Sequence, residues 1–367
     1  GGVTLGLGSA IQTVTGGSGD DVITGGTVVT KDDVIKGGDG TDTIKLTIGD
    51  STYDGEADDE LFGVSEFETI DVSSTNDNAT VELDTLWSGI TTLVAGADVK
   101  LTTITGAANS TAITFDLNGT TRTTDATDSI ATVTEAAVLV AATIDALDDF
   151  TATSAAGVVT TTNTGSGVVE IDTFAGGVTI SSTAAYSNIT FTDAAGTETL
   201  DILSANKVTY KLKDASATDD SLTVNLKVLS DDKSKNQTIG DIDISNIETL
   251  NLNTSGLGSS YTQTLSNISA DGDLLTLNIT GSNNLTIGDV SSDNASLKTI
   301  DASTYTGDLT FSDAADVKQT ITTGAGNDSV AFAGNLTEDD VVDLGGNTAT
   351  SDGSDANDTV TATGNLG

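Results

Sequence analysis

Alternation of apolar and polar residues is the dominant pattern along most of this chain. It is clearest in residues 274–287 (LLTLNITGSNNLTI) and in residues 309–321. Alternation turns one set of side chains inward and the other toward solvent, as in a half-buried strand. Such segments recur about ten residues apart, with Gly, Asp and Asn between them. The pattern therefore predicts stacked coils or a sandwich of many short strands.

A short phrase recurs ahead of these alternating segments. Residues 64–72 read VSEFETIDV and residues 244–252 read ISNIETLNL, with weaker copies at 196–202 and 297–301. Each copy joins an (E/K)-T-(I/L) step to an alternating strand. We interpret the copies as successive rungs, in which Asn and Thr at equal positions can form ladders of hydrogen bonds.

One segment, residues 134–147 (TEAAVLVAATIDAL), breaks the alternation and predicts a helix. Thr134 can act as its N-cap, and the negative charge of Glu135 in the first turn interacts favourably with the helix dipole. Strands are expected before and after it, at 112–117 and 150–161. We predict a small α+β insert over residues 107–176, and this unit resembles inserts of flagellar hook and surface-layer proteins.

Composition restricts the chemistry. The 367 residues carry 55 acidic and 13 basic side chains, a formal net charge of −42, and contain no His, Cys, Pro or Met. Disulfides, thiolate nucleophiles, Ser-His pairs, zinc-thiolate sites and HExxH zinc sites are excluded, which leaves hard cations bound by carboxylate and carbonyl oxygens. Nucleic acid is not an expected partner, because its phosphates would meet a strongly negative field and a single Arg.

Membrane insertion and catalysis are not expected either. No apolar run approaches the roughly 18 residues of a membrane helix, and the first residues, GGVT, do not read as a secretory signal. The chain therefore looks like a mature product or a segment of something longer. Carboxylates are so frequent that no pair of them marks an active site, and the single Trp87 is interpreted as packed at a coil edge.

Glycine-rich nonapeptides of the form GGxGxDxUx, where U is apolar, carry the most specific signal. Residues 16–24 and 37–45 match at every specified position, and residues 25–36 form a stretched copy between them. Residues 324–330 lack only the first Gly, and residues 357–360 form half a motif. Glycines permit backbone angles closed to other residues, and the sixth-position Asp offers a carboxylate to an ion.

The motif assigns roles to individual residues. The apolar residue at position eight is expected to point into the coil (Ile23, Ile35, Ile44 and Val330). The predicted calcium ligands are Gly17, Gly19, Asp21, Asp33, Gly38, Asp39, Gly40, Asp42, Gly324, Gly326, Asp328 and Asp358. The alternative interpretation is plain Gly/Asp turns without metal. Residues 50–60 form a further acidic loop, which is either an ion site or a solvated turn.

These nonapeptides, followed by the repeated phrase and the Thr/Asn-rich rungs, resemble bacterial surface-layer proteins of the repeats-in-toxin (RTX) type. The resemblance implies a calcium-binding parallel β-roll, type I secretion, and self-assembly into a lattice at the cell surface. The nonapeptides are few and interrupted, so a long uniform β-roll is not expected, and no C-terminal secretion signal is evident.

We therefore predict an all-β, calcium-bound parallel β-helix or β-roll solenoid with a small α+β insert. The expected regions are 1–50 (nonapeptide β-roll), 51–106 (rungs), 107–176 (insert), 177–322 (rungs) and 323–367 (second calcium-binding region). Calcium would also relieve the self-repulsion of the acidic chain.

The function expected is a structural subunit of a calcium-dependent, self-assembling surface layer or extracellular filament. Its partners would be copies of itself, and possible further partners are cell-surface polysaccharides. The alternative is a calcium-dependent RTX adhesin or ice-binding solenoid domain of a larger secreted protein. Ice binding needs TxT repeated at one coil period, and the matches at 102–105, 190–192 and 359–361 do not recur at a fixed spacing.

Overall fold

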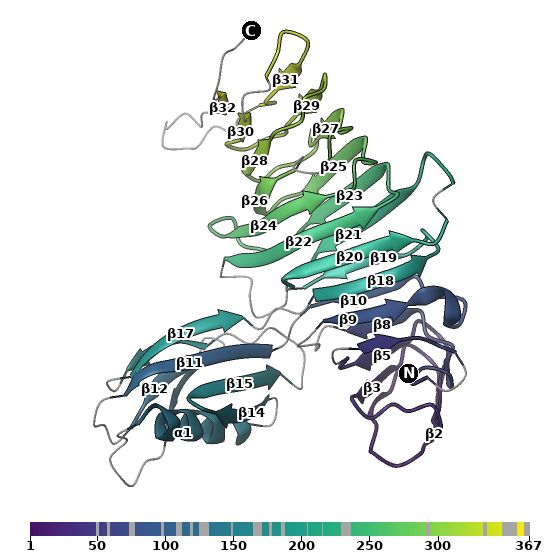
Figure 1. Ribbon diagram of the computed structural model, residues 1–367, viewed down its shortest axis with the longest axis vertical. Coiled ribbons are helices and arrows are strands. Elements are labelled where there is room, and N and C mark those ends of the chain that lie inside the picture. Colours follow the sequence, from purple (N-terminus) through teal and green to yellow (C-terminus); the bar gives the residue numbers. More distant parts are fainter. Residues whose placement is uncertain are drawn as a thin grey trace.

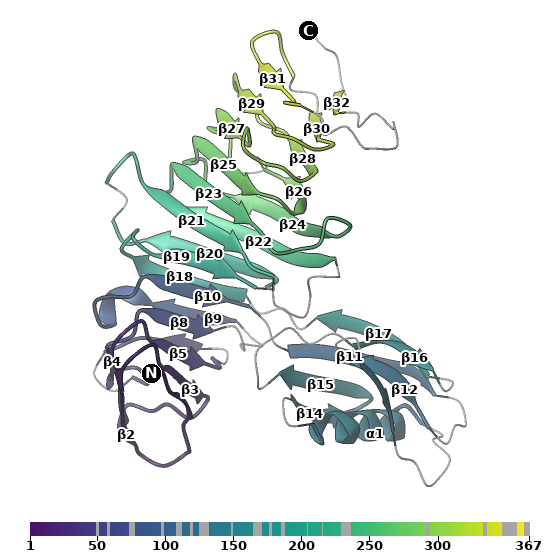
Figure 2. The same cartoon turned by 180° about the vertical axis from the view of Figure 1, so that it is seen from behind.

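Two long parallel sheets run along one axis and form a solenoid, beside which lies a separate α+β unit (Figures 1 and 2). The computed structural model describes residues 1–48, 51–56, 59–72, 78–96, 99–107, 112–117, 120–124, 132–147, 150–163, 171–175, 178–184, 188–203, 205–214, 216–228, 236–290, 294–332, 336–346 and 358–362.

The first long sheet has twelve strands in the described chain, and every neighbouring pair is parallel. Their spatial order is β1 (Thr4–Gly6), β3 (Val22–Gly26), β5 (Thr43–Leu46), β8 (Thr69–Val72), β10 (Thr92–Ala95), β19 (Thr199–Ile202), β21 (Ser221–Leu226), β23 (Thr249–Thr254), β25 (Thr276–Gly281), β27 (Thr299–Asp301), β29 (Thr320–Thr322) and β31 (Val341–Asp343).

The second long sheet has ten described strands, and a short third sheet lies near the N-terminal end. The second contains β6 (Ser51–Tyr53), β9 (Ala79–Glu82), β18 (Asn188–Ala194), β20 (Lys207–Leu212), β22 (Gln237–Ser245), β24 (Thr262–Ser269), β26 (Asn284–Asp289), β28 (Leu309–Asp313), β30 (Ser329–Phe332) and β32 (Thr359–Ala362); the third contains β2 (Thr13–Ser18), β4 (Val34–Asp39) and β7 (Val64–Ser65). Successive strands alternate between sheets, so the rungs are stacked coils and not a sandwich.

Equivalent apolar residues stack in register inside the coils. Ile23, Ile44, Ile70 and Leu93 occupy one position on four neighbouring strands, and each is at most 1% exposed. Burying a side chain of this size contributes about 1.5–3 kcal/mol. One continuous core contains the nonapeptide regions and the rungs together, and the position-eight residues point into it as expected.

Polar side chains form the expected ladders on the outer face. Asn225 Nδ2 donates to Asp201 Oδ1 at 2.6 Å, and Asn253 Nδ2 donates to Asn225 Oδ1 at 2.9 Å. The interpretation of Trp87 is also confirmed. Its Nε1 donates to the Phe67 carbonyl at 2.6 Å, and the two rings meet edge to face with centroids 5.9 Å apart.

The α+β unit interrupts the solenoid between β10 and β18, yet β8, β10 and β19 pair across the interruption as if it were absent. It contains one four-stranded sheet, β14 (Phe150–Ala155), β15 (Val158–Asn163), β11 (Val99–Ala107) and β17 (Val178–Ala184), and one three-stranded sheet, β13 (Thr120–Thr123), β12 (Thr114–Leu117) and β16 (Ile171–Ala175). Its strands thus extend from Val99 to Ala184, beyond the expected limits of 107 and 176.

The single described α-helix, α1 (Val133–Asp145), packs on β11, β14 and β15 over its own core. Its N-cap is Thr132 and not Thr134. The Thr132 side chain accepts from the Glu135 amide at 3.2 Å, while Glu135 accepts from the Thr132 amide at 3.0 Å. This T-x-x-E capping box is visible in the sequence and outcompetes the cap two residues later.

Candidate metal centre

Asp21 and Asp42 lie at the ends of the two complete nonapeptide turns, and both are at most 1% exposed. Asp21 Oδ1 accepts from the Val3 amide at 2.6 Å, and Asp42 Oδ1 accepts from the Asp21 amide at 2.8 Å. The other oxygen of each carboxylate, Oδ2, is buried and has no hydrogen-bond donor. An ionised oxygen in that position is costly unless a cation or water meets it.

The motif glycines bring further oxygens to the same place. A Cβ on Gly16 would lie 2.3 Å from Asp21 Oδ2 and 2.4 Å from the Gly37 carbonyl oxygen. One coil on, a Cβ on Gly37 would lie 2.6 Å from Asp42 Oδ2 and 1.9 Å from the Glu66 carbonyl oxygen. Each turn therefore places a carboxylate oxygen and a carbonyl oxygen of the next coil beside a bare glycine. Calcium takes both kinds of oxygen as ligands.

The predicted carbonyl ligands stack directly on one another. A Cβ on Gly38 would meet the Gly17 carbonyl oxygen at 2.3 Å, and one on Gly40 would meet the Gly19 carbonyl oxygen at 2.6 Å. All four have φ between 109° and 147°, which only glycine adopts without strain. Asp39, between the two glycines of its turn, is exposed, and its carbonyl accepts from the Gly19 amide at 2.7 Å.

Asp33, in the stretched copy, lies in a different environment. Its Oδ1 accepts from the Gln12 amide at 2.7 Å, and its Oδ2 accepts from the Thr30 amide and hydroxyl at 2.8 and 2.9 Å. Burial alone would raise the pKa of Asp33, but these hydrogen bonds outweigh it and hold the pKa below its ordinary value. The geometry favours a turn-capping role over a metal ligand.

The repeated phrase closes the row of glycine turns. Glu68 Oε2 accepts a hydrogen bond from the Asp42 amide at 2.7 Å. In the preceding coil the Asp21 amide donates in the same way to Asp42 Oδ1, so Glu68 takes the place of the next nonapeptide Asp. Glu66 has a φ of 64° and Asn246, its counterpart in the second copy, has a φ of 61°. The phrase is thus a shorter form of the same turn, built without glycine.

Asp328 repeats the pattern near the other end of the solenoid. Its Oδ1 accepts from the Leu309 amide at 2.9 Å, and its buried Oδ2 has no donor. Asp358 lies one coil further and accepts from the Asp328 amide at 3.0 Å. Burial raises the pKa of Asp328 and outweighs the lowering by the nearby Thr323 hydroxyl and the Leu309 amide, and the charges of Asp358 and Asp308 raise it further.

The two C-terminal motif glycines also lie beside backbone oxygens. A Cβ on Gly324 would meet the Tyr305 carbonyl oxygen at 2.0 Å, and one on Gly326 would meet the Gly307 carbonyl oxygen at 2.5 Å. The structure thus brings Gly324, Gly326 and Asp328 into one turn.

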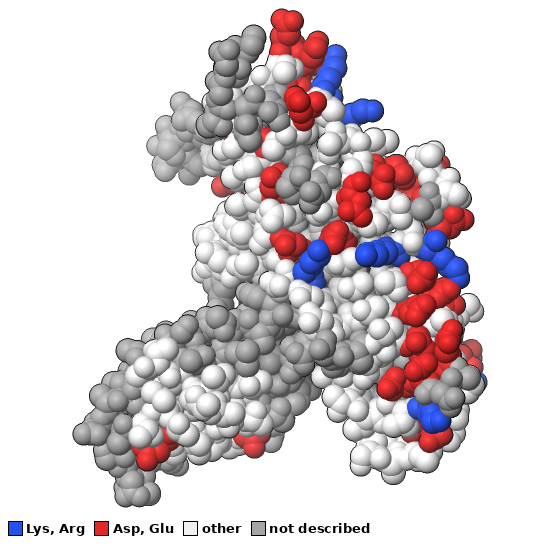
Figure 3. All heavy atoms as spheres, in the orientation of Figure 1, with Lys and Arg blue, Asp and Glu red and all other residues white. Residues whose placement is uncertain are grey.

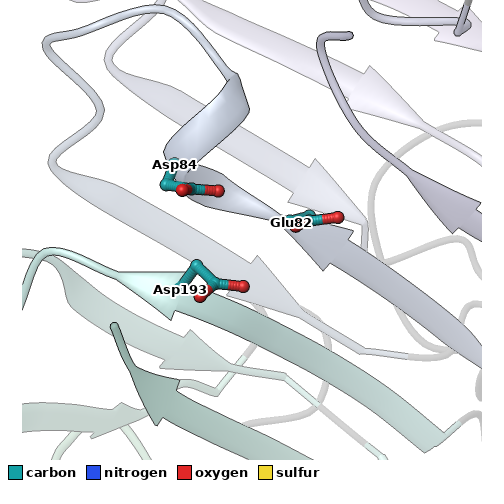
Figure 4. Close-up of side chains that lie close together, drawn as sticks. All are labelled: Glu82, Asp84 and Asp193. Atoms are coloured by element: carbon teal, nitrogen blue, oxygen red, sulfur yellow. The ribbon is translucent and has the colours of Figure 1, made fainter. Parts of the chain in front are cut away.

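An acidic cluster that sequence reasoning missed lies on the solenoid edge. Glu82 of β9, Asp84 of the 3-10 helix η1 (Leu83–Thr85) and Asp193 of β18 each place a carboxylate oxygen within 4.8 Å of the other two (Figure 4). Lys213 forms an ion pair with Asp84. Burial raises the pKa of Glu82, and Asp193 adds to it. No local signal marks this cluster, because the insert separates Glu82 from Asp193 in sequence.

Asp54 and Glu56 of the predicted acidic loop lie near this cluster, since their charges also raise the pKa of Glu82. Asp50 and Asp58 fall outside the described residues. Figure 3 shows acidic side chains gathered along the solenoid edge away from the insert.

No protein-family model matches this chain, and searches of curated proteins and of solved structures find no match either. Within the described ranges, no helix has the length and apolar character required to cross a bilayer. The evidence for the function of the chain therefore comes from its carboxylates and glycine turns.

Proposed function

We propose that this chain is a calcium-ordered structural solenoid, a subunit of a self-assembling surface layer or extracellular filament. The observation that supports calcium is the buried, donor-free Oδ2 of Asp21 and Asp42 at the glycine turns. At Asp21 and Asp42 this oxygen lies beside a carbonyl oxygen of the next coil.

Calcium suits these turns better than other cations. The donors are carboxylate and carbonyl oxygens, and the sequence contains no His or Cys for a softer metal. When bound, the ion supplies a positive charge that would link adjacent coils through ligands of both. Because an unfolded chain lacks the site, the free energy of binding becomes free energy of folding.

A structural role accords with how the chain uses its buried and half-buried carboxylates. Those of Asp21, Asp42 and Glu68 accept from backbone amides of neighbouring coils, so they connect rungs. We propose no catalytic role for them. Copies of the chain are the proposed partners, bridged by calcium between acidic edges, and cell-surface polysaccharide is a further proposed partner. Extracellular placement by type I secretion follows from the RTX resemblance alone.

The ice-binding alternative has less support. One row of Thr follows the first sheet in register (Thr43, Thr69, Thr92, Thr199 and Thr223). The outward row two residues later is mixed, with Lys45, Asp71, Val94, Asp201 and Asn225 at the same five strands. A TxT surface needs Thr in both rows.

Electron micrographs of the purified chain in calcium, in magnesium and in EGTA test the proposal. Sheets or filaments that form in calcium and dissolve in EGTA are the expected result, with magnesium as the control for charge screening alone. Assemblies unchanged by EGTA would refute the calcium mechanism. Monomers in calcium, together with thermal hysteresis, would favour the ice-binding alternative.

A further inference from the structure

Asp220 occupies the same place in its coil as Asp42, although no glycine motif precedes it. The Asp220 amide donates to Glu248 Oε2 at 2.8 Å, and the amides of Glu248 and Thr249 donate to the Asp220 carbonyl at 3.1 and 3.0 Å. Asp42 makes the same three contacts with the first copy of the phrase, at 2.7, 3.1 and 3.0 Å. In both places the phrase forms the following coil.

The two aspartates also share an unsatisfied oxygen. Asp220 Oδ2 is buried and has no hydrogen-bond donor, as is the case for Asp42 Oδ2. The sequence after Asp220 agrees with that after Asp21, the equivalent residue of the first nonapeptide, since residues 219–223 read DDSLT and residues 20–24 read DDVIT. They differ upstream, where residues 213–217 (KDASA) replace the glycines.

A cavity takes the place of the missing glycine turn. It has a volume of about 330 Å³, and its lining includes Asp220, Asp214 and the small side chains Ala194, Ala195 and Ala217. A water molecule takes up roughly 30 Å³ of liquid. The cavity is therefore large enough for a cation that keeps several of its waters.

The neighbouring polar groups leave Asp220 Oδ2 without a protein partner. Lys213 also lines the cavity, but its ammonium is paired with Asp84. Glu198 is fully engaged, because it accepts from the amides of Ala195, Gly196 and Thr197 at 2.9–3.1 Å and from the Tyr210 hydroxyl at 2.8 Å. Burial and the negative charge of Glu198 raise the pKa of Tyr210, and the charge of Asp220 raises it further. Asp220 therefore lies in a negatively charged part of the structure.

We infer that this cavity is a binding site for a hard divalent cation of the calcium class. Asp220 Oδ2 is its anchoring ligand, the Asp214 carboxylate, which accepts from the Ser216 amide at 3.0 Å, adds negative charge at the cavity, and water completes the coordination. The inference rests on the cavity and the orphaned oxygen at Asp220, so it does not depend on whether Asp21 and Asp42 bind calcium.

The test counts calcium ions bound by the full chain in equilibrium dialysis. Asp220→Asn should bind one ion fewer than the wild type, because the amide keeps its size and its backbone contacts but loses the charged oxygen. The matched control is Asp219→Asn at the exposed neighbour, which should keep the full count. Ala217→Leu, which fills the cavity from an exposed loop position, should also lose one ion.

Thermal unfolding separates a ligand from a structural residue. In EGTA, Asp220→Asn should unfold at the same temperature as the wild type or higher, and in calcium at a lower one. Equal destabilisation in both conditions, or a full ion count in both Asp220→Asn and Ala217→Leu, would overturn the inference. Loss of an ion in Asp220→Asn without any loss in Asp42→Asn would support this site while refuting the proposed glycine-turn sites.

Discussion

Replacing Asp42 by Asn tests the proposed glycine-turn sites most directly. The substitution exchanges the buried, donor-free Oδ2 for an amide nitrogen of similar size. The remaining oxygen can still accept from the Asp21 amide, which lies 2.8 Å from Oδ1. The change therefore removes one charge and one metal ligand while leaving the contact between the two coils in place.

The magnitude follows from binding linkage. An ion that binds only the folded chain stabilises it by about 2.7 kcal/mol when its free concentration is 100 times Kd. The calcium-dependent part of the unfolding free energy should fall by about this amount in Asp42→Asn. In EGTA the variant should be as stable as the wild type or more stable, because it no longer buries a charge without a donor.

Urea unfolding followed by circular dichroism, at fixed free calcium and in EGTA, measures both values. Asp32→Asn is the control, since Asp32 is an exposed carboxylate of the stretched copy and is not a predicted ligand, and it should change neither. An equal loss of stability with and without calcium would show that Asp42 acts through its protein contacts alone. The calcium interpretation of the turn would then be wrong.

Three further predictions concern groups outside the metal turns. Tyr210→Phe removes the hydroxyl that donates to the buried Glu198 at 2.8 Å, so we expect a loss of about 1–3 kcal/mol in urea unfolding; no loss would show that water replaces the hydroxyl. Asp33 has a lowered pKa in the folded chain, so its stabilising contribution is complete above the ordinary value of 3.8 and is lost as the pH falls through the lower folded value. Asp33→Asn should therefore be less stable than the wild type at neutral pH and approach it in acid; a constant difference at all pH values would contradict this. Thr132→Ala removes the capping contact to the Glu135 amide and should cost about 1 kcal/mol, measured as lower protection from hydrogen exchange in α1, and unchanged protection would argue against the cap.

Several features of the site could be predicted because they are local in sequence. The glycine turns need a residue without a side chain at Gly37, because a Cβ there would clash with the Glu66 carbonyl. The glycines that meet this need are adjacent in the sequence, so the motif reveals them. The same turns place Asp21 and Asp42 at a fixed offset from their glycines, and both have a buried, donor-free oxygen. The T-x-x-E cap of α1 is equally local, but the N-cap was predicted at Thr134 and this prediction was wrong.

Other features depend on which coils become neighbours. Glu82 and Asp193 meet because β9 pairs with β18 across the insert. The sequence around either residue contains no pattern that predicts this contact. Asp33 lies in the stretched copy of the motif, yet its carboxylate accepts from Gln12 and Thr30. Asp220 lacks the motif, yet it makes the contacts of Asp42.

The sequence by itself determined that the chain forms short β rungs joined by glycine and aspartate turns, because alternation and turn chemistry act over a few residues. It also identified α1 and an oxygen-rich set of ligand candidates. Only the tertiary structure decided which coil lies on which, where the insert leaves the stack, and which carboxylate oxygens remain without donors. The physical reason is that a carboxylate of one coil is satisfied by amides of another, 18 to 30 residues away in the chain.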